Sequence, residues 1–359
     1  MAEVFIRLLN REALERLGVA DVAAAVADVR ETLRLAADGA AVMPPEVAVR
    51  FDDRPAGERP AGPAGGPPGG SPRRDAAVYA LPAYVGGPFS AIGVKWTAHR
   101  PPDAGDGAPR ILSVTVLNDA RTGRPVAVLE SALITAMRTA AVSWLAMEHL
   151  GRTAIERVGI LGAGSQARQH LRMLAHQMPR LTEVLVWNRG AAHAEALART
   201  FAHEAPWPIR IGESVGAVAA ASDVLITCTA APTPIVDRAC VRPGLLAIQV
   251  GFHEFSFEAI EAFDQVVVDG WGEFRLTSQK SLFRMHRAGR FPAERVAADL
   301  TDLVWRGRAF APGQSVYVSS FGLSVFDVAI AARLARAGER AGIGQLFPLG
   351  GFPQGEWPG

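Results

Sequence analysis

A glycine-containing turn in the middle of the chain constrains its fold more than any other segment. A short apolar run at 158–161 meets the turn GAGSQA at 162–167, and a pattern typical of an amphipathic helix follows it. This strand–turn–helix order fits the G-x-G-x-x-G/A signature of a dinucleotide-binding βαβ unit. There the first glycine permits the tight turn, the second lets the backbone approach a pyrophosphate, and the small third residue lets the helix pack on the strand. The alternative is a glycine-rich turn in another α/β fold.

The bulk composition is that of an ordinary globular protein. The 359 residues are enough for two domains, and 49% of them are hydrophobic. The 37 basic and 36 acidic residues give a net charge of +1, which favours neither a nucleic-acid partner nor a membrane partner. No apolar run reaches the about 20 residues that span a bilayer. Charges spread through the N-terminal segment argue against a signal peptide, so we expect a cytoplasmic protein.

Cysteine and histidine usage argues against a structural metal. The chain has 2 cysteines, Cys228 and Cys240, which are too few for a disulfide framework or a Cys-based zinc site. No H-E-x-x-H spacing is present. We therefore expect no metal.

The order of expected elements indicates an α/β protein with two domains. Strands alternate with helices over 157–270, which predicts a doubly wound parallel sheet, a Rossmann domain that we place at 131–314. Residues 1–130, together with 315–345, form the expected second, α+β domain. The region from 315 to 337 reads as helical, and 346–359 as a tail. A Pro/Gly-rich segment at 53–74 predicts a disordered surface loop. A helix is expected over 131–150, with Ser131 as its N-cap.

Three basic residues stand in apolar surroundings. Arg138 lies on a helix that is apolar nearly all round, and a buried guanidinium needs an anion. Lys95 follows the apolar run AIGV, where a lowered pKa would suit proton transfer. Arg50 lies in the similar run VAVRF. The alternatives are a structural ion pair for Arg138 and side chains that extend to solvent for the other two. Together, the three cations favour an anionic substrate such as an amino or keto acid.

Two further positions follow expected Rossmann strands. Asn188 and Arg189 stand where an acidic residue would bind the ribose of NAD, so this pair tolerates or prefers the 2′-phosphate of NADP. His253 and Glu254 follow the Val250-Gly251 pair at the carboxyl end of a strand, where reactive groups gather in open α/β sheets. The alternative is that both are surface residues.

Several stretches together resemble the ornithine cyclodeaminase/μ-crystallin family. They are ALPAYVGG, GVKW, VLNDARTGRPVAVLES, ITAMRTAA, GILGAGSQARQH, VWNR and SSFGLSVFDVA, and they extend over nearly the whole chain apart from 53–74 and the tail. Within the family, VRF, GVKWTAHRP, LNDARTGRPVAVLE and TSQKS look most similar to the branch that makes 2,3-diaminopropionate. Enzymes of this branch are dehydrogenases of N-(2-amino-2-carboxyethyl)-glutamate.

The resemblance implies roles for particular residues. Arg50, Lys95 and Arg138 match substrate-binding positions, and among them Lys95 and Arg138 would be catalytic; we add His253 as a substrate-binding candidate. The matched cofactor-binding positions are Gly162, Gly164, Ser165, Gln166, Ala167, Asn188, Arg189, Thr229, Val250, Gly251 and Ser320. The family also implies NAD or NADP as cofactor, an amino-acid-derived substrate, and a homodimer assembled through the non-Rossmann domain.

Two departures from the family pattern limit the expected function. True cyclodeaminases have an aspartate after the V-G pair, and here Phe252 and His253 follow it. In the diaminopropionate branch a histidine follows a threonine-serine pair, and here Gln279 and Lys280 follow Thr277-Ser278. We expect oxidation and hydrolysis of a secondary amine to an amine and a 2-oxo acid. The alternatives are reduction of a ketimine, cyclodeamination of ornithine, and dinucleotide-dependent binding without catalysis.

Overall fold

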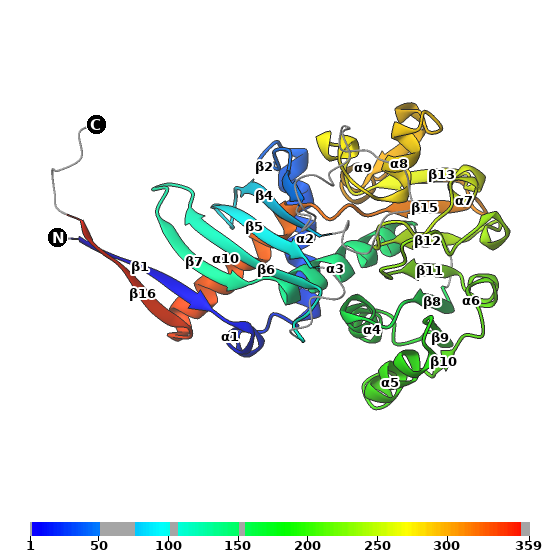
Figure 1. The fold of residues 1–359 in the computed structure, drawn as a ribbon, viewed down its shortest axis with the longest axis horizontal. Helices are drawn as coiled ribbons and strands as arrows, with labels where there is room; N and C mark the ends of the chain where they lie inside the picture. Colours follow the sequence, from blue (N-terminus) through cyan, green and yellow to red (C-terminus); the bar gives the residue numbers. More distant parts are fainter. Residues whose placement is uncertain (1, 51–75, 101–106, 151–154, 353–359) are drawn as a thin grey trace, which may run out of the picture. The chain divides into compact units, whose positions relative to one another are not determined.

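The computed structural model describes residues 2–50, 76–100, 107–150 and 155–352, which fold into two compact units. The described residues within 1–18, 42–134 and 327–359 form one unit, and those within 19–41 and 135–326 form the other (Figure 1). The predicted loop at 53–74 and the end of the predicted tail, from 353 on, lie outside the described residues.

The first unit is built on a mostly antiparallel sheet. In the described part of the chain, eight strands form it in the order β16-β1-β7-β6-β5-β4-β2, and β3 pairs with β4. Strands β1 and β7 are parallel neighbours, whereas β4 to β7 follow one another as antiparallel neighbours. The elements are β1 (Ala2–Leu9), α1 (Arg11–Arg16), β2 (Ala41–Val42), β3 (Val47–Arg50), β4 (Ala77–Val85), β5 (Ala91–His99), β6 (Ile111–Asp119), β7 (Pro125–Glu130), α10 (Ser324–Ala341) and β16 (Gln345–Phe352).

One face of this sheet is buried and the other is exposed. Along β5, buried and less buried residues alternate, as the two-residue period of a strand requires. Helix α10 packs along the buried face (Figure 1), where a Cβ atom on Gly93 would lie 3.1 Å from the side chain of Val328. The other face carries exposed apolar side chains, among them Tyr84, Ile92, Trp96, Val114 and Val126.

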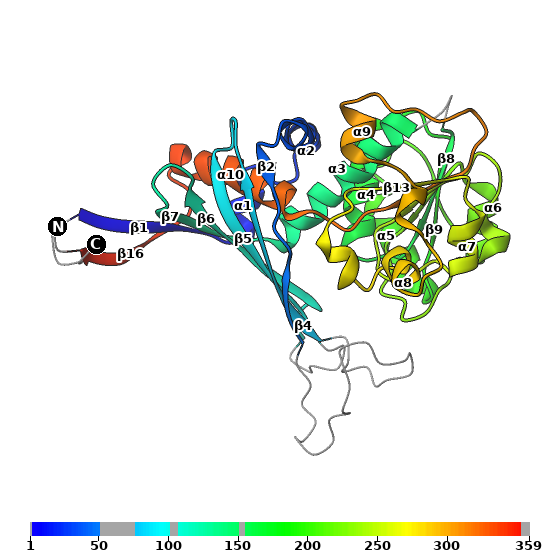
Figure 2. The same cartoon turned by 90° about the horizontal axis from the view of Figure 1, so that it is seen from above.

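The second unit is built on a parallel sheet. Eight strands of the described chain form it in the order β10-β9-β8-β11-β12-β15-β13-β14. Helices α4 and α5 lie on one side of it and α6 and α7 on the other (Figure 2). The elements are α2 (Val22–Ala37), α3 (Ala132–Leu150), β8 (Arg157–Leu161), α4 (Ser165–Gln177), β9 (Glu183–Trp187), α5 (Ala191–Phe201), β10 (Ile209–Ile211), α6 (Val215–Ala221), β11 (Val224–Thr227), β12 (Leu246–Gln249), α7 (Phe257–Ala262), β13 (Gln265–Val268), α8 (Ser281–Arg287), β14 (Val296–Asp299), α9 (Leu300–Val304) and β15 (Val316–Ser319).

The central strands of this sheet are buried on both faces, as is typical of a doubly wound sheet. Every residue of β11, β12 and β15 is buried. The predicted α/β class, with a Rossmann sheet and a second α+β domain, is therefore confirmed.

Three predicted boundaries differ from the structure. Residues 316–319, predicted as helical and assigned to the first domain, form strand β15 inside the parallel sheet. Four successive buried residues fit a central strand, and a short apolar run does not distinguish strand from helix by its periodicity. Residues 345–352, mostly predicted as tail, form strand β16, which pairs antiparallel with β1. Helix α2, predicted within the first domain, groups with the second unit.

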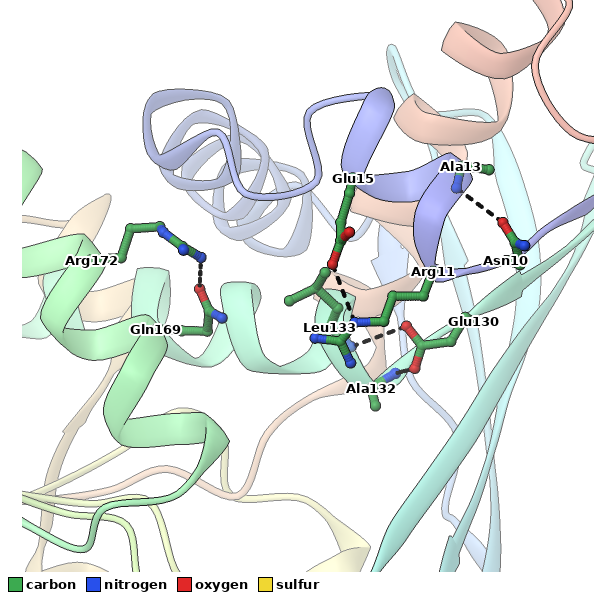
Figure 3. A network of polar contacts seen from close by, with 9 residues as sticks. All are labelled: Asn10, Arg11, Ala13, Glu15, Glu130, Ala132, Leu133, Gln169 and Arg172. Carbon is green, nitrogen blue, oxygen red and sulfur yellow. Dashed lines mark hydrogen bonds and ion pairs between the residues drawn. The ribbon is translucent and has the colours of Figure 1, made fainter. Parts of the chain in front are cut away.

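Ser131 directly precedes α3, at the position predicted for its N-cap, and its hydroxyl lies 2.6 Å from the Thr115 hydroxyl. The Glu130 carboxylate accepts hydrogen bonds from the backbone N–H groups of Ala132, at 2.7 Å, and Leu133, at 3.4 Å (Figure 3). A carboxylate suits this position because it satisfies unpaired N–H groups and complements the positive end of the helix dipole.

Candidate functional site

The glycine turn connects β8 to α4 in the predicted way. Gly162 has a φ of +114°, and a Cβ atom there would lie 2.7 Å from the carbonyl oxygen of Cys228. A side chain is therefore excluded both by the backbone conformation and by the neighbouring loop. The N–H group of Gly162 donates to the Trp187 carbonyl oxygen at 2.8 Å, which joins the turn to the end of β9.

The beginning of α4 has the features of a phosphate-binding site. Its N-cap is Gly164, which makes no side-chain capping bond, and the space beside the Gly164 Cα atom is open. The first-turn N–H groups, which include those of Ser165, Gln166 and Ala167, have no intrahelical acceptor and so can bind an anion. Ala167 is fully buried, as close packing of helix on strand requires. These residues fit the pyrophosphate of a dinucleotide.

Polar contacts hold the first turns of α4 and join them to α3. Gln169 accepts a hydrogen bond from Arg172 at 2.8 Å (Figure 3). The imidazole of His170 lies 2.8 Å from the Gln166 carbonyl oxygen and 2.9 Å from the Ser143 hydroxyl on α3. Burial lowers the pKa of His170 to about 4, so the ring is neutral at neutral pH and joins α4 to α3.

Asn188 and Arg189 follow β9, at the position predicted for ribose recognition. The Asn188 amide donates to the Gly190 carbonyl oxygen at 3.0 Å and so shapes the turn before α5. Arg189 is exposed at this turn. An exposed cation at this end of the sheet is accessible to a 2′-phosphate.

Glu254 lies in the loop after β12 and is fully buried, so the surface alternative is wrong for it. Its carboxylate accepts hydrogen bonds from the Thr227 hydroxyl and from the Thr229 N–H group, both at 2.5 Å. A Cβ atom on Gly251 would lie 2.5 Å from the same carboxyl group, so the glycine is required there. Burial raises the pKa of Glu254, and its hydrogen bonds and Lys280 oppose that shift.

His253, the neighbouring candidate, is half-buried. Its Nδ1 atom lies 3.2 Å from the Ser281 hydroxyl. Burial, together with the charge of Arg284, lowers the pKa of His253 to about 4. The imidazole is therefore neutral at neutral pH.

Lys280 is a buried cation that sequence reasoning missed. Its side chain donates hydrogen bonds to the carbonyl oxygens of Val250, at 2.6 Å, and Gly251, at 2.8 Å. Burial lowers the pKa of Lys280 to about 8, and the charges of Glu254 and Asp269 oppose that shift. The segment TSQKS is polar, so no local signal distinguished Lys280 from a solvent-exposed lysine.

Arg138 is buried, as predicted, and packs against the loop after β15. A Cβ atom on Gly322 would lie 2.7 Å from a terminal nitrogen of its guanidinium. The N–H group of Gly322 donates to the carboxylate of Asp269 at 2.6 Å, and the Ser320 hydroxyl donates to the same oxygen at 3.1 Å. Burial raises the pKa of Asp269, and its hydrogen bonds and the charges of Lys280 and Arg138 oppose that shift. This buried acidic residue is thus distant from Arg138 in sequence.

Lys95, in the first unit, has a buried acidic partner. Its Nζ atom lies 3.1 Å from the Asp327 carboxylate, and its side chain is 5% exposed. The alternative of a lysine that extends to solvent is therefore wrong. Arg50 ends β3, where its backbone pairs with Ala77. Asp327 was not predicted as a site residue, although it lies within the family motif SSFGLSVFDVA.

Two classes of site have no counterpart in what the structure describes. Among residues 2–50, 76–100, 107–150 and 155–352, no group of three or more His, Cys, Asp or Glu side chains is placed to hold a metal ion. No helix within these same ranges is long and apolar enough to cross a membrane.

Comparison with known proteins places the chain among dehydrogenases and reductases. Residues 69–261 match the model of the ornithine cyclodeaminase/mu-crystallin family. N-((2S)-2-amino-2-carboxyethyl)-L-glutamate dehydrogenase of Staphylococcus aureus is 26% identical over 280 residues, which cover 76% of this chain and 82% of that protein. Delta(1)-pyrroline-2-carboxylate/Delta(1)-piperideine-2-carboxylate reductase of Azospirillum brasilense is 31% identical over 248 residues, or 67% and 76% of the two chains.

The fold is shared with a solved structure. Thermococcus litoralis Delta(1)-pyrroline-2-carboxylate reductase, in complex with NADH and L-proline, has a TM-score of 0.82 and 24% sequence identity. The match covers 95% of this chain and 99% of that one. At this identity the likeness establishes the common architecture.

Proposed function

Because the chain belongs to the ornithine cyclodeaminase/mu-crystallin family, we propose that it is a nicotinamide-dependent oxidoreductase that acts on a carbon–nitrogen bond of an amino-acid derivative. The observation that carries this proposal is the glycine turn at β8–α4, whose open, uncapped helix end shares one unit with the buried Arg138. The nicotinamide, when bound, accepts or supplies a hydride.

The cofactor would lie along the carboxyl ends of the parallel strands. The N–H groups at the start of α4 hold its pyrophosphate, and Asn188 with Arg189 stands at its ribose end. Thr229, Val250, Gly251 and Ser320 border its nicotinamide end. Either NAD or NADP fits this arrangement, because Arg189 suits a 2′-phosphate without requiring one.

The substrate is held through its carboxylates. Arg138 and Arg50 are proposed to bind them with charge-assisted hydrogen bonds, each contributing about 1.5–3 kcal/mol. Lys95 donates or accepts the proton at the reacting nitrogen. Its burial and its partner Asp327 support this role, because a lysine held in a dry site keeps a defined position. His253 is proposed to contact the substrate as a neutral imidazole.

The proposed substrate is a secondary amine similar to N-(2-amino-2-carboxyethyl)-glutamate. A hydride leaves the glutamate Cα for the oxidised nicotinamide, and the amine nitrogen loses a proton. Water then adds to the resulting imine and the C–N bond breaks, giving 2,3-diaminopropionate and 2-oxoglutarate. The Staphylococcus aureus relative supports this choice. The two unpaired cysteines, Cys228 and Cys240, suit a reducing compartment such as the cytoplasm.

A second candidate reaction is reduction of a cyclic ketimine such as Delta(1)-pyrroline-2-carboxylate. The Azospirillum brasilense relative favours it. It transfers a hydride in the opposite direction to an imine carbon, so the same residues serve both reactions. Ornithine cyclodeamination is disfavoured because Phe252 and His253 occupy the positions after the Val250-Gly251 pair.

We also propose that the protein is a homodimer. The face of the first-unit sheet opposite α10 exposes Ile92 (43%), Trp96 (49%) and Val114 (39%), and Trp96 pairs with Val114 across β5 and β6. Exposed apolar side chains gathered on one face of a sheet are characteristic of an association surface. A second copy of this sheet would cover it.

The test is a spectrophotometric panel. Purified protein is assayed at 340 nm with NAD or NADP and N-(2-amino-2-carboxyethyl)-L-glutamate or ornithine, and with NADH or NADPH and Delta(1)-pyrroline-2-carboxylate. We expect turnover with the first or the last substrate, and its loss in Lys95→Ala and Arg138→Ala. Tight dinucleotide binding without turnover on any substrate would favour a binding protein. Full turnover by both variants would contradict the assigned roles.

A further inference from the structure

Buried charges join the loops at the carboxyl edge of the parallel sheet. Glu254, in the loop after β12, accepts hydrogen bonds from Thr227 at the end of β11 and from Thr229 just beyond it. One carboxylate therefore fixes two successive loops. Both of these loops carry residues that we assign to the nicotinamide end of the cofactor site.

Lys280 extends this connection to the N-terminus of α8. Its ammonium group donates hydrogen bonds to the carbonyl oxygens of Val250 and Gly251 at 2.6 and 2.8 Å. The residue as a whole is 2% exposed. Because both carbonyl oxygens accept from one ammonium group, the orientation of the two peptide groups that contain them is fixed. The backbone at Val250-Gly251 is therefore oriented by a side chain 30 residues further along the chain.

Asp269 is the second acidic residue whose charge acts on Lys280. It follows β13 and accepts hydrogen bonds from Phe321, at 2.8 Å, and Gly322, at 2.6 Å, in the loop after β15. The charged groups that face Lys280 are thus Glu254, Asp269 and Arg138. Two carboxylates and two cations balance one another where little solvent reaches.

We propose that Lys280 is a positioning residue that, together with Glu254, sets the backbone of Val250-Gly251 for the nicotinamide end of the dinucleotide. The inference rests on the proposed function, because it assumes a dinucleotide at this edge. The adenosine and pyrophosphate end depends on the glycine turn and on Asn188-Arg189, which Lys280 does not touch. Lys280 therefore acts on one half of the cofactor.

The charge of Lys280 is essential to this role. An apolar side chain of similar length would leave two carbonyl oxygens without this donor and two buried carboxylates with less positive charge nearby. Deprotonation of the ammonium group removes the positive charge that offsets these carboxylates, although the neutral amine keeps two N–H donors. Because burial lowers the pKa of Lys280 to about 8, the charge of the clamp is present below that pH and is lost above it, where only the weaker hydrogen bonds of a neutral amine hold the carbonyl oxygens.

The experiment compares whole cofactor with a fragment that lacks nicotinamide. NADH and ADP-ribose, or NADPH and 2′-phospho-ADP-ribose, are titrated calorimetrically against wild type, Lys280→Met and Lys280→Arg. Lys280→Met should weaken the reduced dinucleotide about tenfold or more and the fragment less than about threefold. Lys280→Arg, which keeps the charge, should recover part of that loss. Arg290→Met, which removes an exposed cation, is the matched control and should change neither affinity.

A measurement on wild type keeps the test independent of folding. Raising the pH from 7 to 9.5 should weaken dinucleotide binding more than fragment binding, and Lys280→Arg should reduce that difference. Equal weakening of both ligands, or none, would overturn the inference. If wild type bound neither ligand at any pH, the proposed function itself would fail, which is a distinguishable outcome.

Discussion

The ammonium group of Lys95 lies 3.1 Å from the carboxylate of Asp327, although 232 positions separate the two residues in the chain. Both side chains are buried, so each neutralises a charge that the interior would otherwise disfavour. Asp327→Asn should lower the free energy of unfolding by roughly 3–5 kcal/mol, because it leaves a buried cation with a neutral partner. Urea denaturation measures the change.

The control is the pair of apolar replacements. Lys95→Met combined with Asp327→Leu removes both charges, and this double variant should be more stable than Asp327→Asn alone. If the loss of unfolding free energy in the double variant equalled the sum of the losses in Lys95→Met and Asp327→Leu, a direct interaction would be contradicted.

The two glycines of the β8–α4 turn should separate folding from binding. Gly162→Ala forces a side chain into a φ of +114° and against Cys228, and should lower the free energy of unfolding by about 1–3 kcal/mol. Gly164→Ala meets open space, so it should keep the melting temperature and weaken dinucleotide binding about tenfold or more. Thermal melts and calorimetric titration report the two properties. Gly216→Ala, where the added Cβ atom also meets open space, should lower neither the melting temperature nor the affinity for the dinucleotide.

His170 should make stability depend on pH below neutrality. Its pKa is about 4 in the folded protein, against about 6.5 when unfolded, so the unfolded state binds more protons between these values. The contribution of the neutral ring is complete above pH 6.5 and falls as the pH drops toward 4. By pH 5 the loss is about 2 kcal/mol.

The measurement is urea denaturation at pH 7.5 and pH 5. Wild type should lose more stability than His170→Gln over this interval, because the variant has no imidazole to protonate. His253→Gln serves as a comparison, since the pKa of the half-buried His253 is also about 4. Identical pH dependence in wild type and His170→Gln would contradict the prediction.

The exposed sheet face should control oligomeric state. Trp96→Glu places a charge in the apolar patch and should convert the proposed homodimer to monomer at micromolar concentration, as measured by light scattering during gel filtration. Trp305→Glu alters another exposed tryptophan, 53% exposed in the second unit, and should leave the dimer intact. A wild-type monomer under the same conditions would refute the proposed dimer.

Local pattern was sufficient for the elements that carry strong periodicity or a turn signature. The helix at Val22–Ala37 carries both signals in its own sequence, an amphipathic pattern and the N-cap residue Asp21. The glycine turn has the strand, φ value and helix that its signature predicts. Local pattern failed at β16, because Pro348, Gly350 and Gly351 are unusual in a strand. An edge strand tolerates them, since it needs fewer ladder hydrogen bonds.

The sequence by itself determined three features: the βαβ unit, the alternation of strands and helices that makes the doubly wound sheet, and the burial of Arg138. Each was read from residues that lie close together in the chain. Only the tertiary structure decided which groups are the partners of the buried charges. The pairs Lys95 with Asp327, Glu254 with Thr227, and Asp269 with Gly322 join residues 232, 27 and 53 positions apart. The stability of a buried charge depends on partners brought by other strands, so local sequence does not reveal it.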